Sequence, residues 1–339
     1  MMILLWSVIA FVAHALALSP PASRTSPPSG ALIVRAGTTA SGEYKDLASA
    51  VAALPSGSSS QAIFIYPGTY TGQVTLKRDG PVTIYGYTTS AGSQAANQVI
   101  LTASVDATSA GSDEASGTLR IHTDNVKIYN VNIRNDFGQG SQAIAVALYG
   151  DMVGLYACGL YGYQDTVYTN QGRHVLLQGY IQGAVDFIFG KLGQAYFEGN
   201  TIAIAGSGCI TADGRESDDA GIYLFNRNTI AVASGVSSSS LSGKYYFGRP
   251  WRDYARVIFL NTYISSPTIN KALWSEWSSS SPQTDHVTYS DYNTTGPGVP
   301  STSRPSFASA LSASQAAAYT IGTAVGSDYA NWVDKSYLF

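Results

Sequence analysis

Short apolar runs of three to six residues, rich in Val, Ile, Tyr and Phe, alternate with polar and turn residues from position 62 onward. Runs of this length bounded by Gly, Pro and Asn are typical of β-strands. In the first half of the chain they predict strands at 62–66, 82–85, 98–102, 118–121, 126–129 and 131–134. The pattern therefore indicates an all-β protein built from many short strands.

The hydrophobic pattern of residues 153–160 recurs at 174–181 and again at 195–202, so the local repeat is 21 residues long. If each repeat is one coil of a solenoid, equivalent positions stack about 4.8 Å apart, the spacing of paired strands. Longer intervals elsewhere fit loops inserted at one or two corners. The sequence thus predicts a right-handed parallel β-helix. A β-sandwich or barrel also uses short strands, but it does not predict the 21-residue self-similarity.

Two further patterns concern the corners and the ends of this solenoid. Asn200, Asn228 and Asn261 each precede a Thr, which predicts a corner where Asn amides stack from coil to coil. Residues 44–54 have apolar positions at helical spacing and end before a proline, so we expect a helix that caps the N-terminal end. Residues 306–318 predict a similar short helix near the C-terminus.

The N-terminus predicts a signal peptide over residues 1–17. A continuous apolar run from position 3 ends in Ala15, Leu16 and Ala17, a small-x-small cleavage pattern. A short membrane anchor is the alternative, but the run is shorter than the ~20 residues that a bilayer needs. Residues 18–32, rich in Pro and Ser, predict a linker, and 33–339 a single β-helix domain. We therefore expect a secreted, extracellular protein with no membrane attachment after signal cleavage.

Composition narrows the class of partner. Charged residues make up 12% of the chain, the net charge is -3, and Lys and Arg are not clustered. This argues against nucleic-acid binding, which needs a basic surface, and the 45% hydrophobic content argues against disorder. Few charges with many Gly, Ser, Thr and Tyr suit a secreted all-β protein.

Candidate metal and disulfide sites are weak. The four histidines show no zinc spacing, and the acidic loop 213–219 lacks an EF-hand pattern, so a solvated loop is favoured over a calcium site. Cys158 falls at an apolar position of the repeat, which favours two buried thiols over a bridge with Cys209, although secretion permits a disulfide.

The clearest candidates for chemistry are two aspartates one repeat apart. Asp165 and Asp186 are separated by 21 residues, so a solenoid would place them side by side on one face. Two close carboxylates do not both ionise easily, which indicates an acid/base or acid/nucleophile pair. Arg249 could hold one of them in its charged form, and Trp251 beside it offers a flat face for a sugar ring.

Gln142 and Gln164 are 22 residues apart, again close to one coil. Their side-chain amides could donate hydrogen bonds to a developing oxyanion. Each feature also has a purely structural interpretation, because an aspartate in a turn often bonds only its own backbone. The shared spacing of both pairs favours the functional interpretation. It does not distinguish an esterase from a glycosidase, since carboxylate pairs serve both.

Several segments carry a resemblance to a known family. They are Ser-Gln-Ala-Ile-Ala at 141–145, Gly-Tyr-Gln-Asp-Thr at 162–166, Gly-Ala-Val-Asp-Phe-Ile-Phe-Gly at 183–190 and Phe-Gly-Arg-Pro-Trp at 247–251, preceded by matches at 42–47 and 63–70. In this order the chain resembles the pectin methylesterases (pectinesterases) over roughly residues 34–335, and fungal members more than plant ones. Ala184 stands where many relatives carry Thr, a departure that leaves the catalytic set intact.

The resemblance implies a role for each candidate. Asp186 would be the nucleophile that attacks the methyl-ester carbonyl of a galacturonate unit. Asp165 would protonate the leaving methanol and then activate water. Gln142 and Gln164 would stabilise the oxyanion, and Arg249 would position Asp186 and keep it ionised.

Substrate contacts implied by the resemblance are Arg249, Trp251 and Tyr163. The expected partner is methylated homogalacturonan (pectin), bound by a monomer without metal or organic cofactor, in the modification and degradation of cell-wall pectin. A polygalacturonase or a calcium-dependent lyase on the same fold, a non-catalytic carbohydrate-binding β-helix, and more remotely an acyl-thioesterase, are the alternatives.

Overall fold

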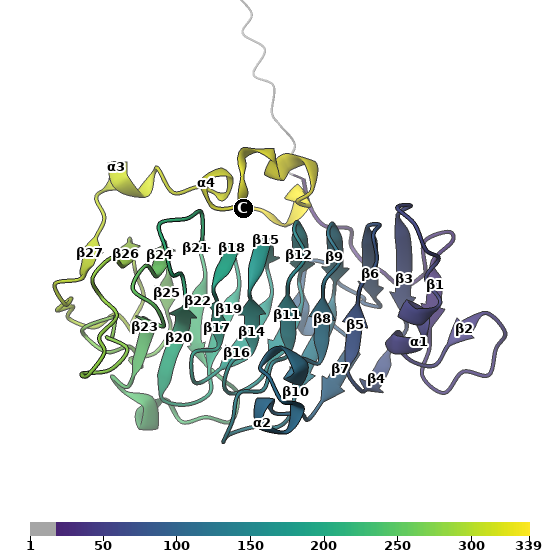
Figure 1. Ribbon diagram of the computed structural model, residues 1–339, viewed down its shortest axis with the longest axis horizontal. Helices are drawn as coiled ribbons and strands as arrows, with labels where there is room; N and C mark the ends of the chain where they lie inside the picture. The colour runs from purple at the N-terminus through teal and green to yellow at the C-terminus, as the bar shows by residue number, and fades with distance from the viewer. Residues whose placement is uncertain (1–17) are drawn as a thin grey trace, which may run out of the picture.

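The computed structural model describes residues 18–339 and forms a long solenoid of three parallel sheets (Figure 1). The expected signal peptide, 1–17, lies outside the described residues. All pairings between the named strands are parallel, and consecutive coils contribute one strand to each sheet in turn. The prediction of a parallel β-helix is confirmed.

The strands of each sheet, in spatial order, are as follows. The twelve-stranded sheet contains β2 (Glu43–Tyr44), β1 (Leu32–Val34), β3 (Gln61–Ile65), β6 (Val82–Gly86), β9 (Val126–Tyr129), β12 (Val153–Tyr156), β15 (Gln171–Leu177), β18 (Leu192–Glu198), β21 (Ile222–Asn226), β24 (Arg256–Leu260), β26 (Thr288–Tyr292) and β27 (Ala308–Ala310). The eight-stranded sheet contains β25 (Tyr263–Ile264), β22 (Thr229–Val232), β19 (Thr201–Ile204), β16 (Tyr180–Gly183), β13 (Gly159–Tyr161), β10 (Val131–Asn135), β7 (Val99–Ala103) and β4 (Gly68–Thr71). The seven-stranded sheet contains β23 (Tyr245–Pro250), β20 (Gly208–Asp213), β17 (Ile188–Gly190), β14 (Val167–Thr169), β11 (Val146–Leu148), β8 (Leu119–Ile121) and β5 (Val74–Leu76).

Helices are few and short. The α-helices are α1 (Leu47–Ala52), α2 (Ala107–Ala110), α3 (Ala313–Ala316) and α4 (Ile321–Val325). The 3-10 helices are η1 (Gln94–Ala96), η2 (Glu114–Ser116), η3 (Ser238–Leu241), η4 (Ser327–Asn331) and η5 (Lys335–Tyr337).

The register of the strands confirms the 21-residue repeat. Val153 pairs with His174, and His174 pairs with Ala195. Because the side chains of paired positions stack directly on one another, the interior becomes a set of ladders. Phe197, Phe225 and Phe259 form one of these, with successive ring centroids 4.3 and 4.2 Å apart. All three are fully buried, so the apolar residues that recur along the sequence form one continuous core.

The Asn corner is confirmed in part. Asn200 and Asn228 stack, and the Asn200 Nδ2 donates to the Asn228 Oδ1 at 3.0 Å. Asn261 was assigned to the same corner wrongly, because Thr229 pairs with Tyr263 and the corner position of that coil is therefore Thr262. The Asn261 amide bonds the side chain of Asn226 instead.

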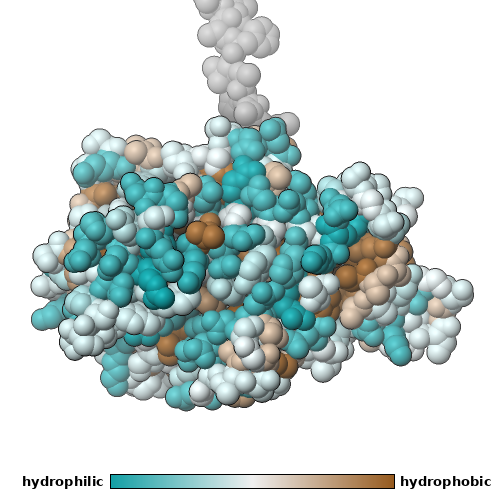
Figure 2. Space-filling view, in the orientation of Figure 1, coloured by the Kyte–Doolittle hydropathy of each residue, from teal (hydrophilic) through white to brown (hydrophobic). Residues whose placement is uncertain are grey.

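The N-terminal helix is shorter than predicted but lies where expected. It begins after Asp46, whose carboxylate accepts from the Ser49 N–H at 2.7 Å, and it buries Leu47 and Ala50. Figure 2 shows a mainly hydrophilic face, with a hydrophobic area near β3 and α1 at this end of the solenoid. The helix thus covers the end of the core, as α1 also contacts β1 and β5.

The predicted helix at 306–318 is largely wrong. Residues 308–310 form β27, which pairs with β26 at the edge of the twelve-stranded sheet, and only Ala313–Ala316 are helical. The unpaired edge of β26 offers backbone hydrogen-bond partners, and pairing with it outweighs the helix propensity of the alanines. Ser312 then caps the short helix that remains.

The chain beyond β27 runs back along the outside of the twelve-stranded sheet (Figure 1). There Tyr337 packs on Tyr129 and Tyr156, while Arg24 donates to the Tyr337 hydroxyl at 2.9 Å. Arg24 belongs to the segment expected as a linker, so this segment lies against the solenoid and contacts the C-terminal tail.

Cys158 and Cys209 are both free and buried, which confirms the interpretation as two separate thiols. Burial raises the pKa of the Cys158 thiol to about 12, so it stays protonated and inert at ordinary pH. No helix within residues 18–339 is long and apolar enough to cross a membrane.

Replacing Asn200 by Ala tests the corner ladder. The Asn200 side chain accepts from the partly buried Gly179 N–H and donates to the buried Leu176 carbonyl. Leaving these groups unpaired should lower the free energy of unfolding by about 1–3 kcal/mol. Urea unfolding measures the change.

The matched control is Asn331→Ala at an exposed position, which should change stability by less than about 0.5 kcal/mol. Equal stability of the two variants would contradict a structural role for the ladder.

Candidate active site

Asp165 and Asp186 occupy equivalent turns on adjacent coils. Each stands two residues before a strand of the seven-stranded sheet, and the first residues of those strands, Val167 and Ile188, are paired. The Asp165 N–H donates to the Val185 carbonyl at 3.1 Å, which joins the two turns directly. The one-coil separation inferred from the sequence is therefore present in the structure.

Both turns use a backbone conformation that side chains other than Gly rarely adopt. The φ angle is 65° at Asp165 and 50° at Asp186. This left-handed conformation costs roughly 1 kcal/mol for a residue with a Cβ, although Asp tolerates it better than most. Because the same bend is repeated on successive coils, both side chains emerge into the same cleft.

A single cleft brings together six of the seven residues singled out from the sequence. Its lining residues are Asp113, Gln142, Gln164, Asp165, Asp186, Phe189, Ala212, Arg249, Trp251 and Trp277. Tyr163 is the exception. Its side chain is not among the residues that line the cleft, and its hydroxyl lies close to Gly206, where an added Cβ would come within 2.5 Å of it.

Arg249 distinguishes the two aspartates. Its Nε donates to Asp186 Oδ1 at 3.0 Å and an Nη donates to Asp186 Oδ2 at 2.7 Å, a bidentate pair. The guanidinium also lies 4.2 Å from the ring centroid of Trp277, in a cation–π contact. Held from two sides, the guanidinium fixes the orientation of the Asp186 carboxylate.

The electrostatic environment assigns the proton within the pair. Burial, the neighbouring Asp186 and the further Asp113 raise the pKa of Asp165 well above its ordinary range. Burial also raises the pKa of Asp186, but the hydrogen bonds and charge of Arg249 oppose that effect. The pair therefore holds one proton on Asp165 and one negative charge on Asp186 over an intermediate pH range.

The two glutamines approach the pair from the same stack of turns. The Ala143 N–H donates to the Gln164 carbonyl at 3.1 Å, so Gln142 and Gln164 lie on neighbouring coils. Within residues 18–339 neither side-chain amide nitrogen donates a hydrogen bond. Both are available to a ligand atom that gains negative charge in the cleft.

Aromatic side chains form one wall of the cleft. Phe189 stacks on Tyr168 with centroids 4.3 Å apart, and Trp251 contacts the edge of Phe189. Four further residues that line the cleft, Phe189, Ala212, Trp277 and Asp113, are not among those that the sequence pattern indicates. Phe189 is three residues after Asp186 on the following strand, and its position in that motif could have indicated it. Trp277 and Asp113 come from loops far away in the sequence and carry no comparable signal.

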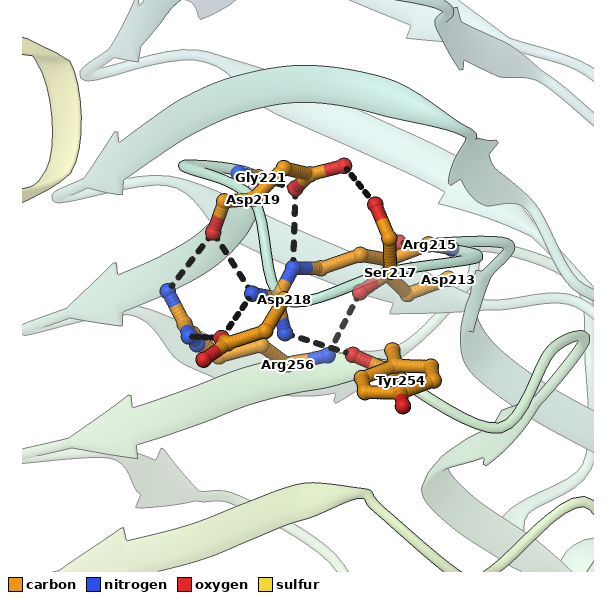
Figure 3. Close-up of polar contacts among 8 residues, drawn as sticks. All are labelled: Asp213, Arg215, Ser217, Asp218, Asp219, Gly221, Tyr254 and Arg256. Atoms are coloured by element: carbon orange, nitrogen blue, oxygen red, sulfur yellow. Dashed lines mark hydrogen bonds and ion pairs between the residues drawn. The ribbon is translucent and has the colours of Figure 1, made fainter.

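The loop after β20 is held by a network of ion pairs (Figure 3). Arg215 is almost fully buried and pairs with Asp218 at 2.6 Å and Asp219 at 2.9 Å, while Arg256 also pairs with Asp218. The sequence favoured a solvated loop here over a calcium site. Only part of the loop is exposed, because arginines bind its carboxylates. Among residues 18–339, no group of three or more potential ligands could hold a metal ion.

The network positions Trp251. The buried Asp213 carboxylate accepts from the Arg215 and Arg256 N–H groups, and the Asp213 carbonyl accepts from the Trp251 N–H at 3.0 Å. At Gly214 a Cβ would come within 2.5 Å of the Trp251 ring, so only glycine permits this close packing.

Comparison with known proteins identifies strong similarities. Residues 33–328 match the family model described as Pectinesterase. A pectinesterase of Aspergillus aculeatus is 41% identical over 325 residues, covering 94% of this chain and 95% of that protein. A pectinesterase of Aspergillus niger is 40% identical over 338 residues, covering 97% of each chain.

Solved structures agree with the sequence matches. The crystal structure of an Aspergillus niger pectin methylesterase superposes with a TM-score of 0.85 at 36% identity, covering 93% of this chain and 100% of that one. The carrot pectin methylesterase gives a TM-score of 0.79 at 26% identity, covering 92% and 97%.

The Asp213 network predicts how stability depends on pH. Burial raises the pKa of Asp213 to about 7, so the folded protein binds this proton more tightly than the unfolded chain does. The contribution of Asp213 to stability is therefore complete below about pH 4 and is lost as the pH rises toward 7. Asp213→Asn should flatten this part of the curve of Tm against pH, measured by thermal unfolding.

The exposed Asp79 supplies the control, since Asp79→Asn should leave the shape of the curve unchanged. If Asp213→Asn followed the wild-type curve in parallel, Asp213 would not titrate in this range.

Proposed function

Because this chain belongs to the pectinesterase family, we propose that it hydrolyses methyl esters of pectin with Asp186 as the nucleophile and Asp165 as the acid and base. The observation that carries this proposal is the bidentate ion pair between Arg249 and Asp186 beside a second buried carboxyl group. One member of the pair is thereby kept charged and oriented, as a nucleophile requires, and the other keeps a proton.

In the first half of the reaction, a galacturonate methyl ester binds with its carbonyl carbon against the Asp186 carboxylate. An Asp186 oxygen attacks this carbon, and the carbonyl oxygen becomes an oxyanion. The amide N–H groups of Gln142 and Gln164 stabilise the negative charge, which is greatest in the transition state. Asp165 then donates its proton to the methoxy oxygen, and the bond between this oxygen and the carbonyl carbon breaks. Methanol leaves, and the acyl group remains joined to Asp186 as an anhydride.

In the second half, Asp165 is a carboxylate and acts as a base. It takes a proton from a water molecule, which attacks the acyl carbonyl carbon of the anhydride. The bond to Asp186 breaks, the galacturonate leaves as a free carboxylic acid, and Asp165 again holds the proton that it needs for the next cycle. No proton needs to pass through a histidine.

Aromatic residues of the cleft supply the binding surface in this proposal. Trp251 and Trp277 line the same cleft as Arg249, and in this proposal their faces pack against sugar rings next to the ester. The role of Tyr163 as a direct substrate contact stays a prediction, since its side chain is not among those that line the cleft. We further propose that the mature protein acts outside the cell as a monomer in the breakdown of cell-wall pectin, consistent with the signal-peptide pattern at 1–17.

Replacing the nucleophile tests the mechanism. Asp186→Asn removes the attacking carboxylate but keeps the size of the side chain, so kcat for methanol release from pectin should fall by about 10³-fold or more. Circular dichroism and thermal unfolding establish that the variant folds.

Asp79→Asn, a carboxylate outside the cleft, should retain wild-type turnover. Near-normal methanol release by folded Asp186→Asn would rule out this nucleophile. New reducing ends or unsaturated products from wild-type protein would instead indicate a hydrolase or a lyase of the pectin chain.

The ion pair predicts the pH profile. Activity requires ionised Asp186 and protonated Asp165, so kcat/KM should rise through the lower apparent pKa of the pair and fall through the higher one. Arg249→Gln removes the cation that favours ionised Asp186. The acidic limb of the profile should therefore move to higher pH.

Arg249→Lys keeps the charge and should shift the acidic limb less, although it loses the bidentate geometry. An unchanged acidic limb in Arg249→Gln would contradict the assignment of the charge to Asp186.

A further inference from the structure

A third carboxylate faces the cleft from a separate part of the chain. Asp113 lies between α2 and η2, outside the stacked turns that carry Asp165 and Asp186. It lines the same cleft as Gln142 and Gln164 and is partly exposed there. Neither the resemblance nor the similarity to known proteins assigns it a role.

The side chain of Asp113 has no partner among the described residues. Its backbone carbonyl accepts from Ser116, but within residues 18–339 its carboxylate forms no hydrogen bond or ion pair, and it does not cap η2. The adjacent Glu114 differs, because it pairs with His122 at 2.8 Å. Asp113 therefore presents an uncompensated negative charge to the cleft.

The surrounding charges leave this carboxylate unneutralised. The other titratable groups in the cleft are Asp165, which holds a proton, and Asp186 and Arg249, whose opposite charges are paired through Nε and one Nη of the guanidinium. The adjacent Glu114 lies 2.8 Å from His122, and burial raises the pKa of Tyr168, which keeps its phenol neutral. An ionised ligand group near Asp113 would therefore meet a like charge without a counterion.

We propose that Asp113 is a specificity-determining residue: its free carboxylate disfavours chain segments whose uronates beside the scissile ester are already ionised, and so selects methylated neighbours. This inference rests on the cleft being the site of ester hydrolysis. Methylation removes the negative charge of a uronate, so pectin and its product differ in charge at each unit that has been demethylated. A like charge in a partly desolvated cleft discriminates between them through repulsion.

The same charge acts on Asp165. Asp113 is one of the groups that raise the pKa of Asp165, after burial and Asp186. Removing it should make Asp165 lose its proton at lower pH, which moves the alkaline limb of the activity profile downward. Burial raises the pKa of Asp113 itself, so selectivity should appear only as the pH rises through that value. A structural role alone would produce neither effect.

Asp113→Asn tests the proposal in the full-length mature protein. The probes are fully demethylated galacturonan as an inhibitor of methanol release, and highly and sparsely methylated pectins as substrates at a pH where Asp113 is ionised. We expect the inhibition constant for the demethylated chain to fall about three- to tenfold. The ratio of kcat/KM on sparsely to highly methylated pectin should rise by a similar factor. Salt at 1 M should largely remove the difference, because the Debye length is then about 3 Å.

Two matched variants complete the experiment. Asp113→Glu keeps the charge and should restore the wild-type preference, and Glu114→Gln removes the neighbouring carboxylate and should leave it unchanged. Unaltered inhibition and unaltered substrate ratio in folded Asp113→Asn would overturn the proposal, as would an equal loss of kcat on both substrates. The nucleophile assignment is tested separately, by the turnover of Asp186→Asn. If that assignment were wrong, the effect of Asp113→Asn on the ratio of kcat/KM between the two pectins could still be measured.

Discussion

Backbone hydrogen bonding between parallel strands of successive coils determines most other features of this molecule. It holds equivalent residues in register, so each recurring apolar position becomes part of a buried ladder such as Phe197, Phe225 and Phe259. The same register places the turns before β14 and β17 one above the other. The adjacency of Asp165 and Asp186 in the candidate active site is therefore a direct consequence of the repeat.

Stacking alone would make the two aspartates alike. They differ because Arg249, contributed by β23 two coils beyond Asp186 in the seven-stranded sheet, binds only one of them. Burial makes this difference large, since a charge removed from water depends strongly on its nearest partner. The guanidinium of Arg249 thus favours the charged form of Asp186, while Asp165 keeps its proton. The ion-pair network around Arg215 then supports the wall that carries Trp251.

Features with a short period along the chain were predictable. The strand positions, the 21-residue coil and the proximity of Asp165 to Asp186 all follow from side-chain alternation and repeat length, which are local properties. Asn261 marks the limit of this reasoning, because the strand register aligns it with Arg227, one position before the corner that Asn200 and Asn228 occupy. The helix predicted for the alanine-rich segment 306–318 is wrong for another reason. Residues 308–310 pair with β26, whose edge would otherwise lack hydrogen-bond partners.

The sequence by itself determined the solenoid, the pairing of the aspartates and, through its resemblance to pectin methylesterases, the chemistry expected of them. Only the tertiary structure decided which loops reach the cleft. Asp113 and Trp277 lie in separate insertions, and nothing in their local sequence specifies where a loop of variable length folds back. Tyr163 shows the converse, because it is next to Gln164 and Asp165 in sequence but is not among the residues that line the cleft. The physical reason is that repeat spacing constrains the stacked coils, whereas long-range packing alone places the loops.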